Sequence, residues 1–127
     1  MATILVVDDE QPIQDMLRTV LETNGYSVLI AGNGFEGLLL HQKHTIDVTI
    51  MDLIMPDTDG IEMISKLMEE SPDAKIIAMT GASGDMNFLD VAKQCGVRRV
   101  FAKPFDLDEM VSAVHEELAR ESSPTSA

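Results

Sequence analysis

Residues 3–21 read TILVVDDEQPIQDMLRTVL: a short apolar run, several polar residues and then apolar residues at helical spacing. The run at residues 4–7 is too short for a stable helix and does not alternate with polar residues, which is typical of a strand buried on both faces. The later apolar residues form one helical stripe, made up of Ile13, Met16, Leu17, Val20 and Leu21. This stretch therefore predicts a strand followed by a helix.

The same unit occurs four more times along the chain. Apolar runs predict strands at residues 28–30, 48–51, 76–79 and 97–101, and helices are predicted at 35–43, 61–68, 86–95 and 107–118. This alternation predicts an α/β domain with a parallel sheet and helices on both faces. A five-stranded sheet of this kind commonly has the order 2-1-3-4-5, so we expect a flavodoxin-like, doubly wound (βα)5 fold.

The residues at the predicted helix ends support these assignments. Pro12 suits a first helical turn, and Gly25 and Gly96 suit helix C-termini. Asp106, with Glu109 three residues later, resembles a capping box in which Asp replaces the hydroxyl residue.

Length and composition indicate one domain. The chain has 127 residues, and we expect a domain at residues 1–121 and a disordered tail at 122–127, which has no apolar anchor. The N-terminus lacks the features of a signal peptide, no apolar run is long enough to span a bilayer, and the single Cys95 permits no internal disulfide. These features predict a cytoplasmic protein. The net charge of −13 argues against non-specific binding to nucleic acid.

Polar residues follow the predicted strands at the edge where sites form in open parallel sheets. Asp8 and Asp9 follow the first strand, Asp52 the third, Thr80 the fourth and Lys103 the fifth. These four strands are consecutive neighbours in the predicted order. We therefore expect the five side chains to lie together.

Clustered carboxylates are costly unless a cation binds among them. Two like charges ~4 Å apart repel by about 4 kcal/mol at an effective dielectric constant of roughly 20. A few hard oxygen ligands suit Mg²⁺, which readily shares a phosphate oxygen. Lys103 can pair with a phosphate, and the Thr80 hydroxyl can donate to it. These parts predict phosphoryl transfer through an aspartyl phosphate.

Each of these residues has a plainer interpretation when taken alone. An acidic residue after a strand is often a helix N-cap or a solvated loop residue. Thr80 alone is typical of a turn hydroxyl, and Lys103 alone of a surface charge. The functional interpretation is favoured because all five fall at the same edge of one sheet.

From about residue 3 to residue 118, the sequence resembles the receiver domain family of response regulators. The resemblance implies a two-component signalling protein that takes a phosphoryl group from a histidine kinase or phosphotransfer protein. Such a domain would catalyse only its own phosphorylation and dephosphorylation. Four motifs carry the resemblance, in order and each at the end of its own predicted strand: Asp8-Asp9, residues 52–60 (DLIMPDTDG), Thr80-Gly81 and Lys103-Pro104-Phe105.

The resemblance implies how this chain would bind Mg²⁺. Asp9, Asp52 and the backbone carbonyl of Ile54 would be direct ligands, and Asp8 would hold the ion through water. The side chain of Ile54 occupies a position that tunes hydrolysis in the family. Its apolar character predicts a long-lived phosphoryl group.

The resemblance also implies roles for other motif residues. Asp52 would accept the phosphoryl group, Lys103 would pair with it, and Thr80 would move inward to hydrogen-bond it. Gly81 would leave access to the site, and the Lys103–Pro104 peptide bond would be cis. Two further pairs would be structural: Met55-Pro56 and Asp59-Gly60.

One position departs from the family pattern. Three residues before its lysine, the family usually has an aromatic residue or His whose ring turns inward as the threonine moves, and this chain has Val100. Adjacent strand residues face opposite ways, so Phe101 should not replace that ring. We expect the signal to pass through Thr80 and the fourth helix without an aromatic rotamer switch.

This sequence has no DNA-binding or catalytic module after residue 118; if it is the whole protein, output is expected through protein contacts. In the family the usual partner face comprises the fourth helix, the fifth strand and the fifth helix. Several basic residues fall near that face here: Lys93, Arg98, Arg99 and Lys103.

Three other functions were weighed against this one. A Mg²⁺-dependent phosphatase with an aspartyl nucleophile usually has a second Asp two residues later and a cap over its site, whereas this chain has Ile54 there and no spare length. A flavin-binding domain would need a phosphate loop after the first strand, where Asp8, Asp9 and Glu10 would repel phosphate. A degenerate receiver used only as a scaffold is disfavoured by the complete set of site residues.

Overall fold

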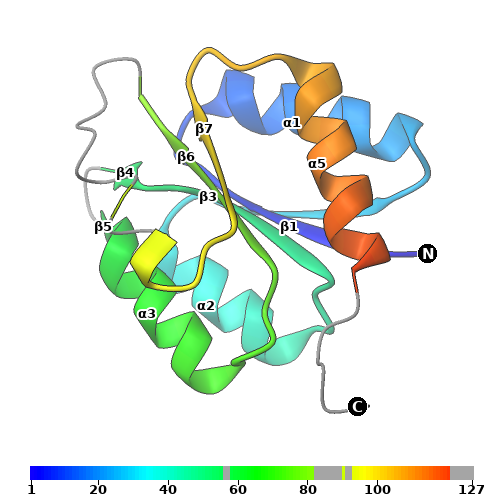
Figure 1. Cartoon of the computed structure of the whole chain (residues 1–127). Helices are drawn as coiled ribbons and strands as arrows, with labels where there is room; N and C mark the ends of the chain where they lie inside the picture. Colours follow the sequence, from blue (N-terminus) through cyan, green and yellow to red (C-terminus); the bar gives the residue numbers. More distant parts are fainter. Residues whose placement is uncertain (56–57, 82–89, 91–92, 121–127) are drawn as a thin grey trace.

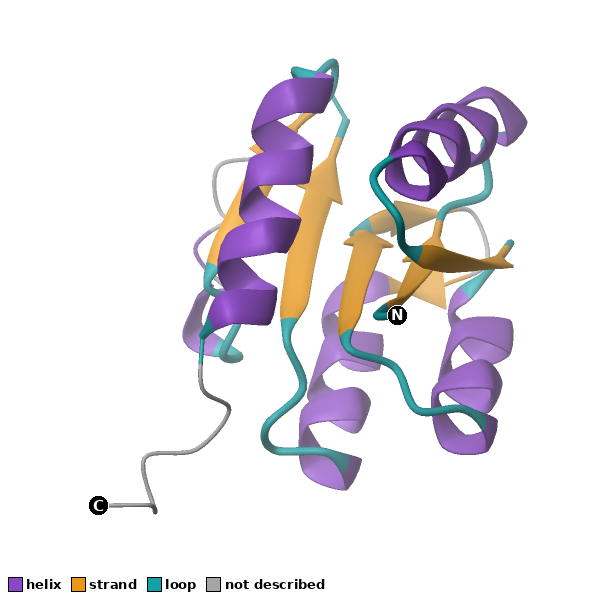
Figure 2. Cartoon of the chain, turned by 90° about the vertical axis from the view of Figure 1, so that its right-hand side faces the viewer, coloured by secondary structure: helices purple, strands orange, loops and turns teal. Residues whose placement is uncertain are grey.

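The computed structural model describes residues 1–55, 58–81, 90 and 93–120. A parallel sheet lies between two layers of helices, as Figures 1 and 2 show. Its strand order is β2-β1-β3-β6-β7, so the five predicted strands and their predicted order are confirmed. The strands are β1 (Thr3–Val7), β2 (Ser27–Ala31), β3 (Val48–Asp52), β6 (Ile76–Thr80) and β7 (Arg99–Ala102).

Burial explains why the strands lack polar alternation. Every residue of β3 and β6 is buried, because helices cover both faces of the sheet centre. The edge strands β2 and β7 are only partly covered. A continuous apolar run is therefore the pattern to expect for the central strands.

The helices form one layer on each face of the sheet. They are α1 (Gln11–Thr23), α2 (Gly34–Lys43), α3 (Gly60–Glu70) and α5 (Leu107–Ala119). In Figure 1, α1 and α5 lie on one face, and α2 and α3 lie on the other. The predicted helix at residues 86–95 falls mainly outside the described residues, as does the predicted tail. None of the described helices is long and apolar enough to cross a membrane.

The helix ends follow the predicted chemistry. Pro12 lies in the first turn of α1, and Gly25 and Gly96 adopt positive φ angles of 90° and 107°. The Asp106 side chain accepts hydrogen bonds from the backbone N–H groups of Asp108 and Glu109 at the start of α5. These local predictions are confirmed.

A small antiparallel hairpin after β3 was not predicted. It consists of β4 (Ile54–Met55) and β5 (Thr58–Asp59) and leads directly into α3. Asp59 caps α3 by accepting from two backbone N–H groups. At Gly60 an added Cβ would lie only 2.5 Å from the Leu53 Cα, so the start of α3 approaches the chain just after β3 more closely than any side chain would allow.

A buried carboxylate holds α5 against the amino end of β7. Glu117 is 1% exposed and pairs with Arg99 at 2.9 Å and with Arg120 at 2.8 Å. Arg99 also pairs with Glu116. Burial alone raises the pKa of Glu117, but the two guanidinium groups outweigh it and hold that pKa below its ordinary value.

We expect Glu117→Gln to destabilise the fold in a pH-dependent manner. A lowered pKa in the folded state means that the ionised carboxylate stabilises the protein above the unfolded-state pKa, and that this stabilisation is lost as the pH falls through the folded-state pKa. The substitution should lower the free energy of unfolding by about 1–3 kcal/mol at pH 7. Urea unfolding at a series of pH values measures this difference. It should shrink below a pH of about 4.3, and a constant difference would mean that Glu117 acts through packing instead of charge.

Candidate functional site

The predicted site residues converge at the carboxyl edge of the sheet. Asp8 directly follows β1, Asp52 ends β3, Thr80 ends β6 and Lys103 directly follows β7. The Lys103 ammonium donates to Asp8 Oδ2 at 2.7 Å and to Asp52 Oδ2 at 2.9 Å. The predicted juxtaposition of the lysine with these two carboxylates is therefore confirmed.

The backbone ladder fixes these residues beyond the strand ends. The Leu53 N–H donates to the Met79 carbonyl at 2.8 Å, and the Lys103 N–H donates to the Thr80 carbonyl at 2.7 Å. The Lys103–Pro104 peptide bond is cis, as the resemblance implied. The hydrogen bond to Thr80 fixes the Lys103 backbone at the end of β7, and the hydrogen bonds of its ammonium show that its side chain extends toward β3 and β1.

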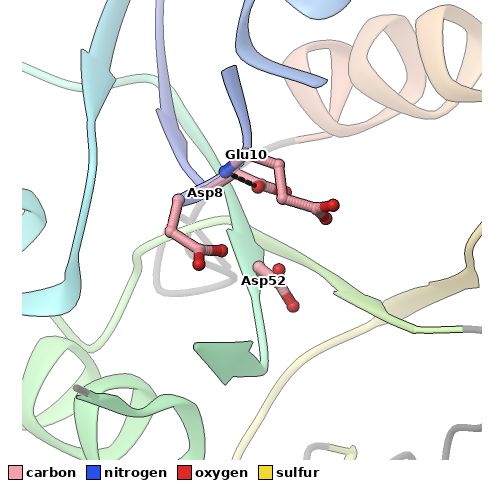
Figure 3. Close-up of side chains that lie close together, drawn as sticks. Asp8, Glu10 and Asp52 are labelled. Atoms are coloured by element: carbon pink, nitrogen blue, oxygen red, sulfur yellow. Dashed lines mark hydrogen bonds between the residues drawn. The ribbon is translucent and has the colours of Figure 1, made fainter. Parts of the chain in front are cut away.

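Four carboxylates form one cluster at this edge. Asp8, Asp9, Glu10 and Asp52 each offer a carboxylate oxygen, and these oxygens all lie within 4.8 Å of one another. Asp8 and Asp52 are buried, whereas Asp9 and Glu10 are exposed. Figure 3 shows how the side chains of Asp8, Glu10 and Asp52 lie close together.

Glu10 was not among the predicted site residues. Its carboxylate accepts from Lys103 at 2.9 Å, and its backbone N–H donates to Asp8 Oδ1 at 2.8 Å. The signal in the sequence was the acidic triplet at residues 8–10, of which only the first two members match the family motif. Glu10 thus contributes a third anionic partner for the lysine.

The chemistry of this cluster fits a hard divalent cation. Carboxylate oxygens are the ligands that Mg²⁺ prefers, and the ion keeps several waters, so a few protein ligands suffice. The four carboxylates and the one ammonium leave a local formal charge of −3. That excess charge is what a cation would neutralise.

The pKa directions reflect the crowding of charge. Burial raises the pKa of Asp8 above its ordinary value, and hydrogen bonds from Lys103 and from the Glu10 N–H offset this only in part. For Lys103, burial alone lowers the pKa, but Asp8, Asp52 and Glu10 together raise it above its ordinary value. The lysine is therefore firmly cationic at neutral pH.

Asp52 is held by both carboxylate oxygens. Oδ2 accepts from Lys103, and Oδ1 accepts from the backbone N–H of Ile54 at 2.9 Å. The Ile54 side chain is 47% exposed beside the site. The assignment of the Ile54 carbonyl as a metal ligand stays a prediction.

Thr80 carries a buried hydroxyl with no hydrogen-bond partner among the described residues. Thr80 is only 1% exposed, and leaving a buried hydroxyl unpaired lowers the stability of the fold by roughly 1–3 kcal/mol. An added Cβ on the neighbouring Gly81 would meet nothing within 4 Å, so the space there is open. The Thr80 hydroxyl is therefore an unused hydrogen-bond donor at the end of β6, the strand next to the one that ends at Asp52.

Val100 and Phe101 face opposite sides of the sheet, as predicted. Phe101 packs on the α1–α5 side and meets Phe105 edge to face, with 6.2 Å between the ring centroids. Val100 packs on the α2–α3 side. Phe101 therefore does not occupy the position that the family's aromatic switch residue would have.

Comparison with known proteins identifies relatives across almost the whole chain. Residues 4–115 match the model of the response regulator receiver domain. Sporulation initiation phosphotransferase F of Bacillus subtilis is 34% identical over 120 residues, which cover 94% of this chain and 96% of that protein. Chemotaxis protein CheY of the same organism is 32% identical over 116 residues, with 91% and 96% coverage.

A solved structure shows the same fold. The response regulator TrrA from Thermotoga maritima, in complex with Mg²⁺ and BeF, superimposes with a TM-score of 0.83. It is 32% identical, and the match covers 93% of this chain and all of that one.

Replacing one buried carboxylate tests the charge balance of the cluster. Because burial already disfavours ionised Asp8, we expect Asp8→Asn to raise the free energy of unfolding by about 1 kcal/mol in Mg²⁺-free buffer. Added Mg²⁺ should stabilise the parent protein more than this variant, since a ligand stabilises the state that it binds. Thermal and urea unfolding with and without Mg²⁺ measure both effects.

Asp73→Asn is the matched control, because it removes the same charge from an exposed residue between α3 and β6. It should leave the response to Mg²⁺ unchanged. Equal stabilisation of all three proteins by Mg²⁺ would contradict a metal site at Asp8.

Proposed function

The chain belongs to the response regulator receiver domain family, and from that premise we propose that Asp52 is its phosphoryl acceptor. Receiver domains are signalling modules, and Mg²⁺ dependence and a cytoplasmic location are typical of them. The chain is homologous to phospho-accepting regulators, so a phosphatase or a degenerate scaffold is not favoured. We propose that this chain, too, acts in the cytoplasm.

The contact of one partly buried ammonium with both Asp8 and Asp52 is the observation that carries the proposal. In the proposed reaction, an Asp52 carboxylate oxygen attacks the phosphorus of a phosphohistidine. The P–O bond forms as the P–N bond breaks, and the imidazole leaves. Lys103 neutralises charge on the phosphoryl oxygens, and the Thr80 hydroxyl donates to one of them.

We assign the metal ligands as the resemblance implied. Asp9, Asp52 and the Ile54 carbonyl would hold Mg²⁺ directly, and Asp8 would hold it through water. When bound, Mg²⁺ supplies positive charge that offsets the negative charge of the cluster and of a phosphoryl group. The position of the four carboxylates at one sheet edge supports this assignment.

Receivers of this type interact with histidine kinases or phosphotransfer proteins. For the downstream partner, we propose the face formed by β7 and α5 together with the fourth helix. A groove of about 350 Å³ between β7 and α5 supports this choice. Phe101 and Ala113 provide apolar contacts there, whereas Asp108, Glu109 and Glu116 make the rim mainly acidic. Arg99 in this groove is already paired with Glu116 and Glu117, so it is not a free basic site.

Intact-mass measurement after incubation with acetyl phosphate tests the acceptor. With Mg²⁺ the parent should gain the mass of one phosphoryl group, and Asp52→Ala should gain none. Without Mg²⁺ the parent should gain little. Phosphorylation of Asp52→Ala to the level of the parent would place the acceptor elsewhere, and no gain in a folded, Mg²⁺-binding parent would favour a scaffold.

Two substitutions test how the signal leaves the site. Adding Mg²⁺ and beryllofluoride should change amide chemical shifts in α5 and β7 of the parent. We expect Thr80→Ala to abolish most of these changes, because it removes the hydroxyl that would donate to the bound group. Phe101→Leu should retain them, because Phe101 packs against Phe105 on the α1–α5 side. Loss of the response in Phe101→Leu with retention in Thr80→Ala would show that an aromatic switch operates after all.

A further inference from the structure

The outer face of α2 carries apolar side chains that the fold does not use. Phe35 is 69% exposed and Leu39 is 48% exposed. The opposite face of α2 is packed, because Gly37 lies against Val7 and Leu40 packs on the core of this side of the sheet. Phe35 and Leu39 are four residues apart and therefore neighbours on one helical face.

Two side chains of opposite charge lie along one side of this apolar face. Glu36 lies three residues before Leu39, and Lys43 lies four residues after it. Glu36 uses Oε1 to accept from the Gly32 N–H at 3.2 Å, and Lys43 has no ionic or hydrogen-bonding partner among the described residues. Being seven residues apart, about two helical turns, these side chains lie along the same flank of α2.

This arrangement is self-complementary for two antiparallel helices. A two-fold axis beside Leu39 brings the two Leu39 side chains together, and it sets Glu36 of each helix opposite Lys43 of the other. The antiparallel orientation also places the positive end of each helix dipole near the negative end of its partner. We propose that two copies of this chain associate through the outer faces of α2.

The size and charge of the surface determine how strong such a dimer would be. One ten-residue helix buries less than the roughly 800 Å² per partner of a standard interface. Each chain also has a net charge of −13, and salt screens this repulsion over about 8 Å at physiological ionic strength. The dimer is therefore a weak, reversible one, with a Kd on the order of 100 µM.

The proposed interface lies on the opposite side of the sheet from the groove beside α5. In Figure 1, α2 and α5 lie on opposite faces of the sheet. Dimerisation through α2 would place two β7–α5 grooves on one particle, so that a partner with two binding segments gains from avidity. The inference does not depend on Asp52 being the acceptor.

Sedimentation equilibrium between about 10 µM and 1 mM tests the association. The average mass of the parent should rise from the monomer value of 13.9 kDa toward twice that value. Glu36→Lys and Lys43→Glu should each remain monomeric, because each places like charges opposite one another. An equimolar mixture of the two variants should associate like the parent, since every pair across the interface is then attractive.

The mixture separates this pairing from the effect of net charge. Glu36→Lys changes the net charge from −13 to −11 and Lys43→Glu changes it to −15, so the mixture has the same mean charge as the parent. Lys66→Glu on the neighbouring α3 repeats the Lys43 charge change outside the proposed interface and should associate much as the parent does. Thermal unfolding of each variant shows that it is folded.

Leu39→Glu should weaken association by about tenfold or more, because it puts two carboxylates at the centre of the interface. Parent protein that remains monomeric at 1 mM, or a mixture no more associated than its two components, would overturn the proposal. In either case the exposed face of α2 would be left to a different protein.

Discussion

The contact between Lys103 and two buried carboxylates is the interaction on which the site depends. The Lys103 ammonium contacts Asp8, directly after β1, and Asp52, at the end of β3. Lys103 itself directly follows β7. One ammonium group therefore holds together the ends of three strands that are far apart in the sequence. Four carboxylates at this edge would repel one another strongly, and one lysine offsets only part of that repulsion. The fold thus leaves an excess of negative charge at this edge, which a bound cation would offset.

Much of this could be predicted because the relevant patterns are local. Central strands such as β3 and β6 are buried on both faces, so their apolar runs stand out without alternation. Parallel topology then brings the residues after these strands to one edge, which is why the sequence alone is enough to group Asp8, Asp52 and Lys103.

The features that were missed depend on side-chain direction and on non-local packing. Glu10 contacts the lysine only because the turn after β1 directs its side chain back over Asp8. Two of the four cluster members are exposed, and exposed acidic residues are also common where there is no site. The hairpin before α3 depends on the close approach of Gly60 to Leu53. Glu117 appears in the sequence as an ordinary residue of an amphipathic helix, and only the positions of Arg99 and Arg120 explain its burial.

The packing around β7 divides its side chains between the two faces of the sheet. Val100 and Phe101 are adjacent in sequence but belong to the cores on opposite faces of the sheet. A ring at position 100 could have linked the site to the α2–α3 side, but valine has no ring to rotate. Phe101 instead contributes to the groove beside α5. Strands β6 and β7 are joined just beyond their ends by the hydrogen bond from the Lys103 N–H to the Thr80 carbonyl, so Thr80 is linked to the strand that carries Phe101. Lys103 thus contacts the acidic cluster through its side chain and β6 through its backbone.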